Sequence, residues 1–208
     1  MHMAEIRNII FDLGGVLMDL YVERTYKAFE SMGFTQEILQ HDRNHKNIFF
    51  QFEIGAVTPE QFRDEIRELI GNRYDDDHID RAWNAMIGGF RKEKIEFVKK
   101  LRPQYRTYIL SNTNQMHEAF YNRLIRLEYG LESLNDIFDR VYYSHHIHLA
   151  KPDPAIFRYV LDENGLTPEE TLYLDDTMKH LEAASAFGIK TILFPLNGNL
   201  EMIYEYLD

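Results

Sequence analysis

Residues 8–20 read NIIFDLGGVLMDL and join an apolar run to a carboxylate and two glycines. The apolar run of residues 8–11 has the length and composition of a buried β-strand. Asp12 follows it directly, and glycines supply backbone freedom after the carboxylate. Alone, Asp12 fits a turn or a helix cap as well as a functional role.

The size and composition of the chain limit the chemistry it can perform. With 208 residues it can bury roughly 70% of its unfolded surface, so folding needs no disulfide or structural metal. It contains no cysteine, which excludes disulfides, thiolate nucleophiles and cysteine-ligated metals. Any catalysis must therefore use Asp, Glu, His, Ser or Lys.

The charge of the chain narrows its partners. Its 34 acidic and 23 basic residues give a net charge of −11, which argues against nucleic acid or an anionic membrane as the main partner. A small anion stays open, because a metal or a buried lysine reverses the local sign. No apolar run approaches the roughly 20 residues that span a bilayer, and no secretion signal is evident, so we expect a cytoplasmic protein.

The chain divides into two regions with different sequence patterns. Residues 21–90 are helical in pattern, aromatic and highly charged, and we expect no strand there. Within them, PEQFRDEIRELIGN predicts a helix that begins at Pro59 after Thr58 and stops at Gly71 and Asn72. Its apolar face comprises Phe62, Ile66, Leu69 and Ile70.

Strand and helix patterns alternate from residue 91 onward. Strands are expected at residues 106–111, 139–144, 171–176 and 190–194, with helices between them. With residues 7–11 they predict a parallel sheet of five strands covered by helices. About 70 residues separate the first strand from the others, too many for a simple crossover. The expected fold is α/β, a Rossmann-like core of residues 1–18 and 91–208 with an inserted all-α cap of residues 19–90.

Polar residues follow four of these strands. They are Asp12, Ser111 with Asn112, Lys151, and Asp175 with Asp176. Open parallel sheets bind ligands at the carboxyl ends of their strands, so these side chains should converge on one edge. Taken alone, the serine and asparagine are typical of turns, and the lysine is typical of an exposed surface. The two adjacent carboxylates are different, because they repel each other unless a cation or hydrogen-bond donors lie nearby.

The set as a whole indicates metal-assisted phosphoryl transfer. Carboxylates from two strand ends suit a hard cation such as Mg²⁺, which also accepts phosphate oxygens. A lysine and short donors can hold the remaining phosphoryl oxygens, and a free carboxylate can attack phosphorus.

Four motifs support this interpretation by resemblance. FDLGGVL, ILSNTN, AKPDPAIF and LYLDDTMKHLEAA resemble, in order and spacing, the motifs of the haloacid dehalogenase (HAD) superfamily. The insert resembles the superfamily's C1 cap, and the chain is most similar to the sugar-phosphatase branch that includes alpha-D-glucose-1-phosphate phosphatases. The resemblance implies a hydrolase of small phosphorylated metabolites, with a hexose 1-phosphate as the expected substrate.

The same resemblance implies a role for each motif residue. Asp12 would be the nucleophile that forms an aspartyl-phosphate, and Lys151 would balance charge and bind substrate. Ser111 and Asn112 would bind phosphoryl oxygens.

It also implies a Mg²⁺ site. Asp12, the main-chain carbonyl of Gly14 and Asp176 would ligate the ion, and Asp175 would support it directly or through water. His180 stands where many relatives have a further acid.

Gly14 departs from the common pattern, because many relatives carry a catalytic acid at this position. The absence of this acid should slow the reaction most for substrates with poor leaving groups, since general acid–base catalysis contributes 10²–10⁴-fold. Replacements considered are Asp19, His41, His45, His117, His145, His146 and His148, although most fit surface or turn roles and their spacing shows no second metal cluster. In the cap, Glu53 is a candidate contact for sugar hydroxyls, by resemblance, beside the expected core aromatics Phe49, Phe50 and Phe52.

Other classes fit less well. A receiver domain places its acidic pair first in the chain, and DLGGVL is not the glycine pattern of a dinucleotide binder. A haloacid dehalogenase proper shares the aspartate nucleophile but works without Mg²⁺. A non-catalytic HAD-like binding module is supported by Gly14 and opposed by the intact Asp12, Lys151 and Asp176.

Overall fold

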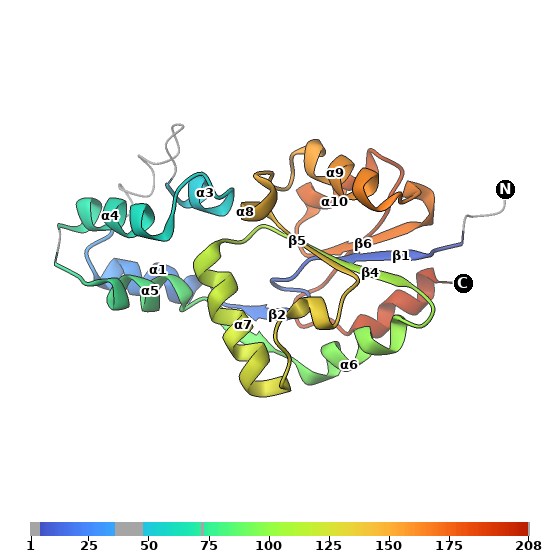
Figure 1. The fold of residues 1–208 in the computed structure, drawn as a ribbon, viewed down its shortest axis with the longest axis horizontal. Helices are drawn as coiled ribbons and strands as arrows, with labels where there is room; N and C mark the ends of the chain where they lie inside the picture. The colour runs from blue at the N-terminus through green and yellow to red at the C-terminus, as the bar shows by residue number, and fades with distance from the viewer. Residues whose placement is uncertain (1–4, 36–47, 72, 208) are drawn as a thin grey trace.

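The computed structural model describes residues 5–35, 48–71 and 73–207. Its core is a five-stranded sheet in the order β5-β4-β1-β6-β7, in which all neighbouring strands are parallel (Figure 1). The strands are β1 (Asn8–Phe11), β4 (Arg106–Ser111), β5 (Arg140–Tyr143), β6 (Thr171–Asp175) and β7 (Lys190–Leu193). The α/β core and its five expected strands are confirmed.

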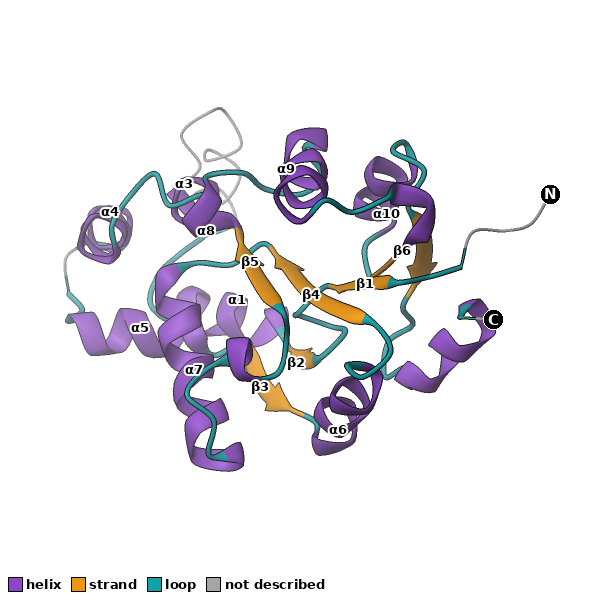
Figure 2. Ribbon diagram, turned by 45° about the vertical axis from the view of Figure 1, so that its right-hand side comes forward, coloured by secondary structure: helices purple, strands orange, loops and turns teal. Residues whose placement is uncertain are grey.

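Helices cover both faces of this sheet (Figure 2). Ile9 and Phe11 face one apolar cluster, and Ile10 faces the other, as the two-residue period of a strand requires. The first cluster packs under α6 (Lys92–Leu101) and α7 (Gln115–Tyr129), and the second under α9 (Pro154–Asn164) and α10 (Met178–Ser185). Shorter elements are α8 (Ser144–Ile147) and the 3₁₀ turns η1 (Leu134–Asp136), η2 (Pro168–Glu170) and η3 (Leu200–Tyr206). None of the described helices is long and apolar enough to cross a membrane.

The cap consists of α1 (Val22–Ser31), α3 (Ile48–Glu53), α4 (Pro59–Ile70) and α5 (Asp76–Asn84). Its apolar core includes the rings of Phe29, Phe52, Phe62 and Trp83. Phe52 and Phe62 stack with ring centroids 4.4 Å apart. Phe49 packs against this core as expected, whereas Phe50 is half exposed, which corrects the expectation for that residue.

Helix α4 has the termini that its sequence predicts. The Thr58 hydroxyl accepts from the Gln61 amide, and the Gln61 side chain accepts from the Thr58 amide, which forms a capping box. Gly71 ends the helix in the left-handed region with φ of 83°. Leu69 is 40% exposed and does not share the buried face, and Asn72 lies outside the described residues.

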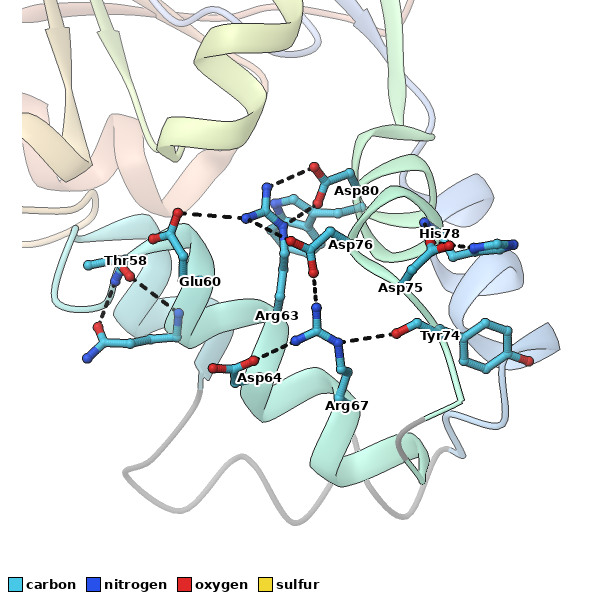
Figure 3. A network of polar contacts seen from close by, with 12 residues as sticks. Thr58, Glu60, Arg63, Asp64, Arg67, Tyr74, Asp75, Asp76, His78 and Asp80 are labelled. Carbon is cyan, nitrogen blue, oxygen red and sulfur yellow. Dashed lines mark hydrogen bonds and ion pairs between the residues drawn. The ribbon is translucent and has the colours of Figure 1, made fainter.

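Ion pairs join α4 to α5 on the outside of the cap (Figure 3). The Arg63 guanidinium donates to both carboxylate oxygens of Asp80, at 2.7 and 2.8 Å. Arg67 contacts Asp76 and donates to the Tyr74 carbonyl at 3.2 Å. The bidentate contact between Arg63 and Asp80 fixes the relative orientation of α4 and α5 as well as holding them together.

A second, two-stranded antiparallel sheet lies at the junction of cap and core. It pairs β2 (Met18–Leu20) with β3 (Ile87–Phe90). The expectation of no strand within residues 21–90 is therefore wrong, because β3 carries two glycines that weaken its strand pattern. A Cβ at Gly88 would lie 2.4 Å from the Tyr21 ring, so close packing requires the glycine.

Candidate active site

The carboxyl ends of β1, β4 and β6 meet at one edge of the sheet. Strand β1 lies between the other two, with Phe11 opposite Ile109 on one side and Leu174 on the other. Asp12, Ser111 and Asp175 therefore end three adjacent strands. The expected convergence of these strand-end residues is what the topology produces.

Lys151 links two of the expected carboxylates. Its ammonium donates to Asp12 Oδ1 at 2.8 Å and to Asp175 Oδ2 at 2.7 Å. The lysine side chain is 1% exposed, so these contacts are shielded from water. A charge-assisted pair in this setting is stronger than one at the surface.

Asn112 fixes the main chain of Lys151. Its amide nitrogen donates to the Lys151 carbonyl, and its amide oxygen accepts from the Lys151 main-chain N–H, both at 2.8 Å. These contacts use the oxygen and one of the two N–H groups of the side-chain amide, and the contact of Asn112 with a phosphoryl group stays a prediction. Ser111 is buried beside it.

Asp175 is fully buried and receives four different donors. Lys151 and the Tyr173 hydroxyl bond one oxygen, and the Thr177 main-chain N–H bonds the other at 2.7 Å. His180 Nδ1 lies 3.0 Å from both oxygens. His180 thus contacts Asp175 from the position where many relatives have an acid. Tyr173 is a member of the site that the sequence did not reveal.

Asp12, Asp175 and Asp176 form a group of oxygen ligands. Each presents a carboxylate oxygen, and these oxygens lie within 4.8 Å of one another. Three carboxylates beside one lysine leave a formal excess of two negative charges. Their oxygen ligands and charge fit a divalent hard cation.

Gly15 gives the carboxylate of Asp176 its place. Its φ is +76°, and a Cβ there would lie 2.1 Å from Asp176 Oδ2. Gly14 has room by comparison, since its Cβ would meet the end of the Leu20 side chain at 3.2 Å. The two glycines of the opening motif therefore have different constraints.

Burial and neighbouring charges shift the pKa values of the site residues in opposite directions. Burial raises the pKa of Asp12 to about 6, against the lowering by Lys151. Burial alone would lower the pKa of Lys151, but the attraction of Asp12 and Asp175 outweighs it and raises that pKa. Burial alone would raise the pKa of Asp175, but the hydrogen bond from His180 and the charge of Lys151 hold it below its ordinary range.

A cavity of about 820 Å³ lies between the cap and these residues. Leu13, Gly14, Ser111 and Asn112 line it from the core, and Phe34, Phe49, Glu53 and Trp83 line it from the cap. Burial raises the pKa of the Glu53 carboxyl to about 7, while His180 lowers it. The core lines the cavity with uncharged residues, whereas its charged residues and the rings of Phe34, Phe49 and Trp83 come from the cap.

The other candidate acids occupy different places. Asp19 accepts from Arg91 at 2.8 Å, and burial lowers the pKa of His117 to about 4 while its ring stacks on Trp83. His148 Nδ1 contacts the Ile54 carbonyl at 2.8 Å. His145 and His146 both contact Glu118, and His41 and His45 lie outside the described residues.

Comparison with known proteins identifies the family. A family model of haloacid dehalogenase-like hydrolases matches residues 6–188. The chain belongs to this family. D-ribitol-5-phosphate phosphatase of Bacteroides thetaiotaomicron is 30% identical over 93% of both chains. The phosphorylated carbohydrates phosphatase of Thermotoga maritima is 29% identical over 88% of this chain and 82% of its own.

A solved structure agrees with this membership. An HAD family enzyme of Bacteroides thetaiotaomicron in complex with magnesium and inorganic phosphate is 34% identical. It superposes with a TM-score of 0.85 over 96% of this chain and 99% of its own. The likeness extends over both the core and the cap.

Proposed function

We propose that this protein is a Mg²⁺-dependent phosphatase of small phosphorylated sugars or polyols. One observation carries the proposal: buried Lys151 bridges Asp12 and Asp175, and Asp176 presents a third carboxylate beside them. Relatives named as phosphatases of ribitol 5-phosphate and of phosphorylated carbohydrates support the substrate class.

Asp12 is the nucleophile in this proposal. Its Oδ1 is held by Lys151, which leaves Oδ2 to attack phosphorus. The P–O bond to the sugar or polyol breaks, the alcohol leaves, and water hydrolyses the resulting aspartyl-phosphate to free Asp12 and phosphate. Lys151 offsets the negative charge of the carboxylate and of the phosphoryl group as they approach each other. Ser111 and Asn112 bind phosphoryl oxygens at the edge of the same sheet.

Asp12, Asp176 and the main-chain carbonyl of Gly14 would hold Mg²⁺. When bound, the ion supplies the positive charge that the carboxylates lack and polarises the phosphoryl oxygens. Because four donors already occupy Asp175, that residue orients Lys151 and would support the Mg²⁺ site indirectly. The carboxylate of Asp176 argues against a metal-independent haloacid dehalogenase, which would not need a metal ligand at this position.

The cap side of the cavity sets the organic part of the substrate. Glu53 lines the cavity and would hydrogen-bond a sugar or polyol hydroxyl, while the aromatic rings of the cap would cover the carbon skeleton of the substrate. A hexose 1-phosphate suits a site without an acid at Gly14, because its anomeric oxygen is a better leaving group than an ordinary hydroxyl. The similarity to a D-ribitol-5-phosphate phosphatase makes a polyol 5-phosphate the second candidate substrate.

A panel of phosphate esters tests this function. D-ribitol 5-phosphate, hexose 1-phosphates, hexose 6-phosphates and p-nitrophenyl phosphate would be assayed with Mg²⁺ and with chelator. We expect phosphate release that requires Mg²⁺ and is abolished in Asp12→Asn. Release that survives this substitution would refute the nucleophile.

A non-catalytic module that binds phosphorylated ligands is the second candidate, and Gly14 favours it. It predicts that the panel shows no turnover while a sugar phosphate still binds to wild type. Calorimetric titration of the same esters separates the two functions.

A further inference from the structure

Three metal-ligating side chains converge outside the candidate active site. Glu118 lies on α7, and His145 and His146 lie on α8. Glu118 Oε2 is 2.9 Å from His145 Nε2 and 3.0 Å from His146 Nε2. We propose that these three residues bind a divalent transition-metal ion of the Zn²⁺ class.

The distances suit such an ion with little movement. Zinc bonds nitrogen and oxygen at roughly 2.0–2.2 Å, which places two ligands of a tetrahedral ion roughly 3.3 Å apart. The two observed separations are a few tenths of an ångström shorter. All three ligand atoms already lie within 4.8 Å of one another.

The burial of the three residues gives the ion a fixed side and an open side. The side chains of His145 and Glu118 are 6% and 21% exposed, whereas that of His146 is 53% exposed. His146 can therefore move to admit the ion, and water completes the coordination from the open side. Among the described residues nothing hydrogen-bonds His145 Nδ1, so the ring can carry its proton there when Nε2 turns from Glu118 to the ion.

The donor set separates this site from the candidate active site. Two imidazole nitrogens and one carboxylate favour Zn²⁺ and its neighbours, while an all-oxygen group favours Mg²⁺. The sequence spacing did not predict this cluster, because Glu118 and the two histidines meet only through the packing of α7 beside α8.

The cluster lies where the cap meets the core. Helix α8 sits beside α3 of the cap (Figure 1). The Ser144 hydroxyl donates to the Glu53 carbonyl at 2.5 Å, and a Cβ at Gly55 would lie 2.3 Å from the His145 carbonyl. An ion held by α7 and α8 would therefore fix α8, the helix that contacts residues 53–55 of the cap.

Metal titration of the full chain tests the proposal without any activity assay. Tag-free, chelator-stripped protein in excess Mg²⁺ would be titrated with Zn²⁺ by calorimetry. We expect wild type to take up one more equivalent than His146→Ala, which alters an exposed side chain. Glu118→Gln keeps the shape of the carboxylate and should weaken this equivalent by at least about tenfold.

His78→Ala is the matched control. His78 is an exposed histidine 2.6 Å from Asp75, a pair that lacks a third ligand among the described residues. Its variant should bind Zn²⁺ as wild type does. Zn²⁺ should also raise the Tm of wild type more than that of His146→Ala.

Equal Zn²⁺ uptake by wild type and His146→Ala would overturn the proposal, as would uptake unaffected by Glu118→Gln. Circular dichroism of each variant shows whether its fold is retained.

Discussion

The two glycines after Asp12 show how a single residue sets the candidate site. Gly15 has a positive φ and lies against Asp176, whereas Gly14 faces the flexible end of Leu20. A side chain at position 15 would displace a carboxylate, while a side chain at position 14 would displace only a methyl group. Sequence reasoning saw backbone freedom in both, because the contact with Asp176 exists only in the fold.

Gly15→Ala and Gly14→Ala form a matched pair. We expect Gly15→Ala to weaken Mg²⁺ binding by at least about tenfold, and Gly14→Ala to leave it within about twofold. Calorimetric titration with Mg²⁺ measures both. Equal losses in the two variants would contradict the placement of Asp176.

Gly14→Asp tests the missing acid. The end of Leu20 can yield a few tenths of an ångström to admit the new side chain. We expect kcat for sugar phosphates to rise at least about tenfold, with little change for p-nitrophenyl phosphate, whose leaving group needs no proton. Equal effects on both esters would count against the account.

Other members of the site were beyond sequence reasoning. Asp12, Lys151 and Asp175 could be predicted, because parallel strands end at one edge of a sheet. The hydroxyl of Tyr173 could not, since a residue within a strand pattern reads as core. The engagement of Asn112 with the Lys151 main chain also depends on tertiary contact.

At the scale of elements, local signals explain which parts of the fold the sequence predicts. Helix α4 is predictable because Thr58, Pro59 and Gly71 mark its ends. Strand β3 is not, because its pairing with β2 depends on a contact across the inserted cap. The ion pairs between α4 and α5 likewise appear only in the fold (Figure 3).

Arg63→Lys tests the link between α4 and α5. Lysine keeps the charge but loses the bidentate contact with Asp80, so we expect a loss of about 1 kcal/mol in the free energy of unfolding. Urea denaturation measures it. Lys99→Ala, which removes an exposed pair with Glu96, serves as the control and should cost no more than about 0.5 kcal/mol. Losses of the same size would show that the bidentate geometry adds nothing.

At the scale of the whole molecule, the insertion places a cap over the edge of the sheet where the candidate site lies. Residues from both parts line the cavity: the core contributes uncharged residues such as Ser111 and Asn112, and the cap contributes Glu53 and the aromatic rings. Sequence reasoning predicted the insertion but not which cap residues enter the cavity. Glu53 links the cap to the core, because its half-buried carboxyl lies close enough to His180 for that residue to lower its pKa.

The raised pKa of Glu53 predicts a pH-dependent stability. The pKa of this carboxyl is about 7 in the folded state, whereas the ordinary pKa of a glutamate, which the unfolded chain retains, is 4.5. Stability should therefore fall as pH rises from 4.5 through 7, by on the order of 1–2 kcal/mol for this half-buried group. Glu53→Gln should remove this part of the fall. Urea denaturation of chelator-treated protein between pH 5 and 8 compares the two slopes, and parallel slopes would contradict the assignment.

The covalent role of Asp12 is the central claim, and trapping the intermediate tests it most directly. Wild-type protein would be mixed with Mg²⁺ and a turned-over sugar phosphate labelled in its phosphoryl group, then quenched with acid. We predict label on the peptide that contains Asp12, released by hydroxylamine as an acyl phosphate, and no label on Asp12→Asn. Turnover without label on that peptide, or equal label on Asp12→Asn, would contradict the account.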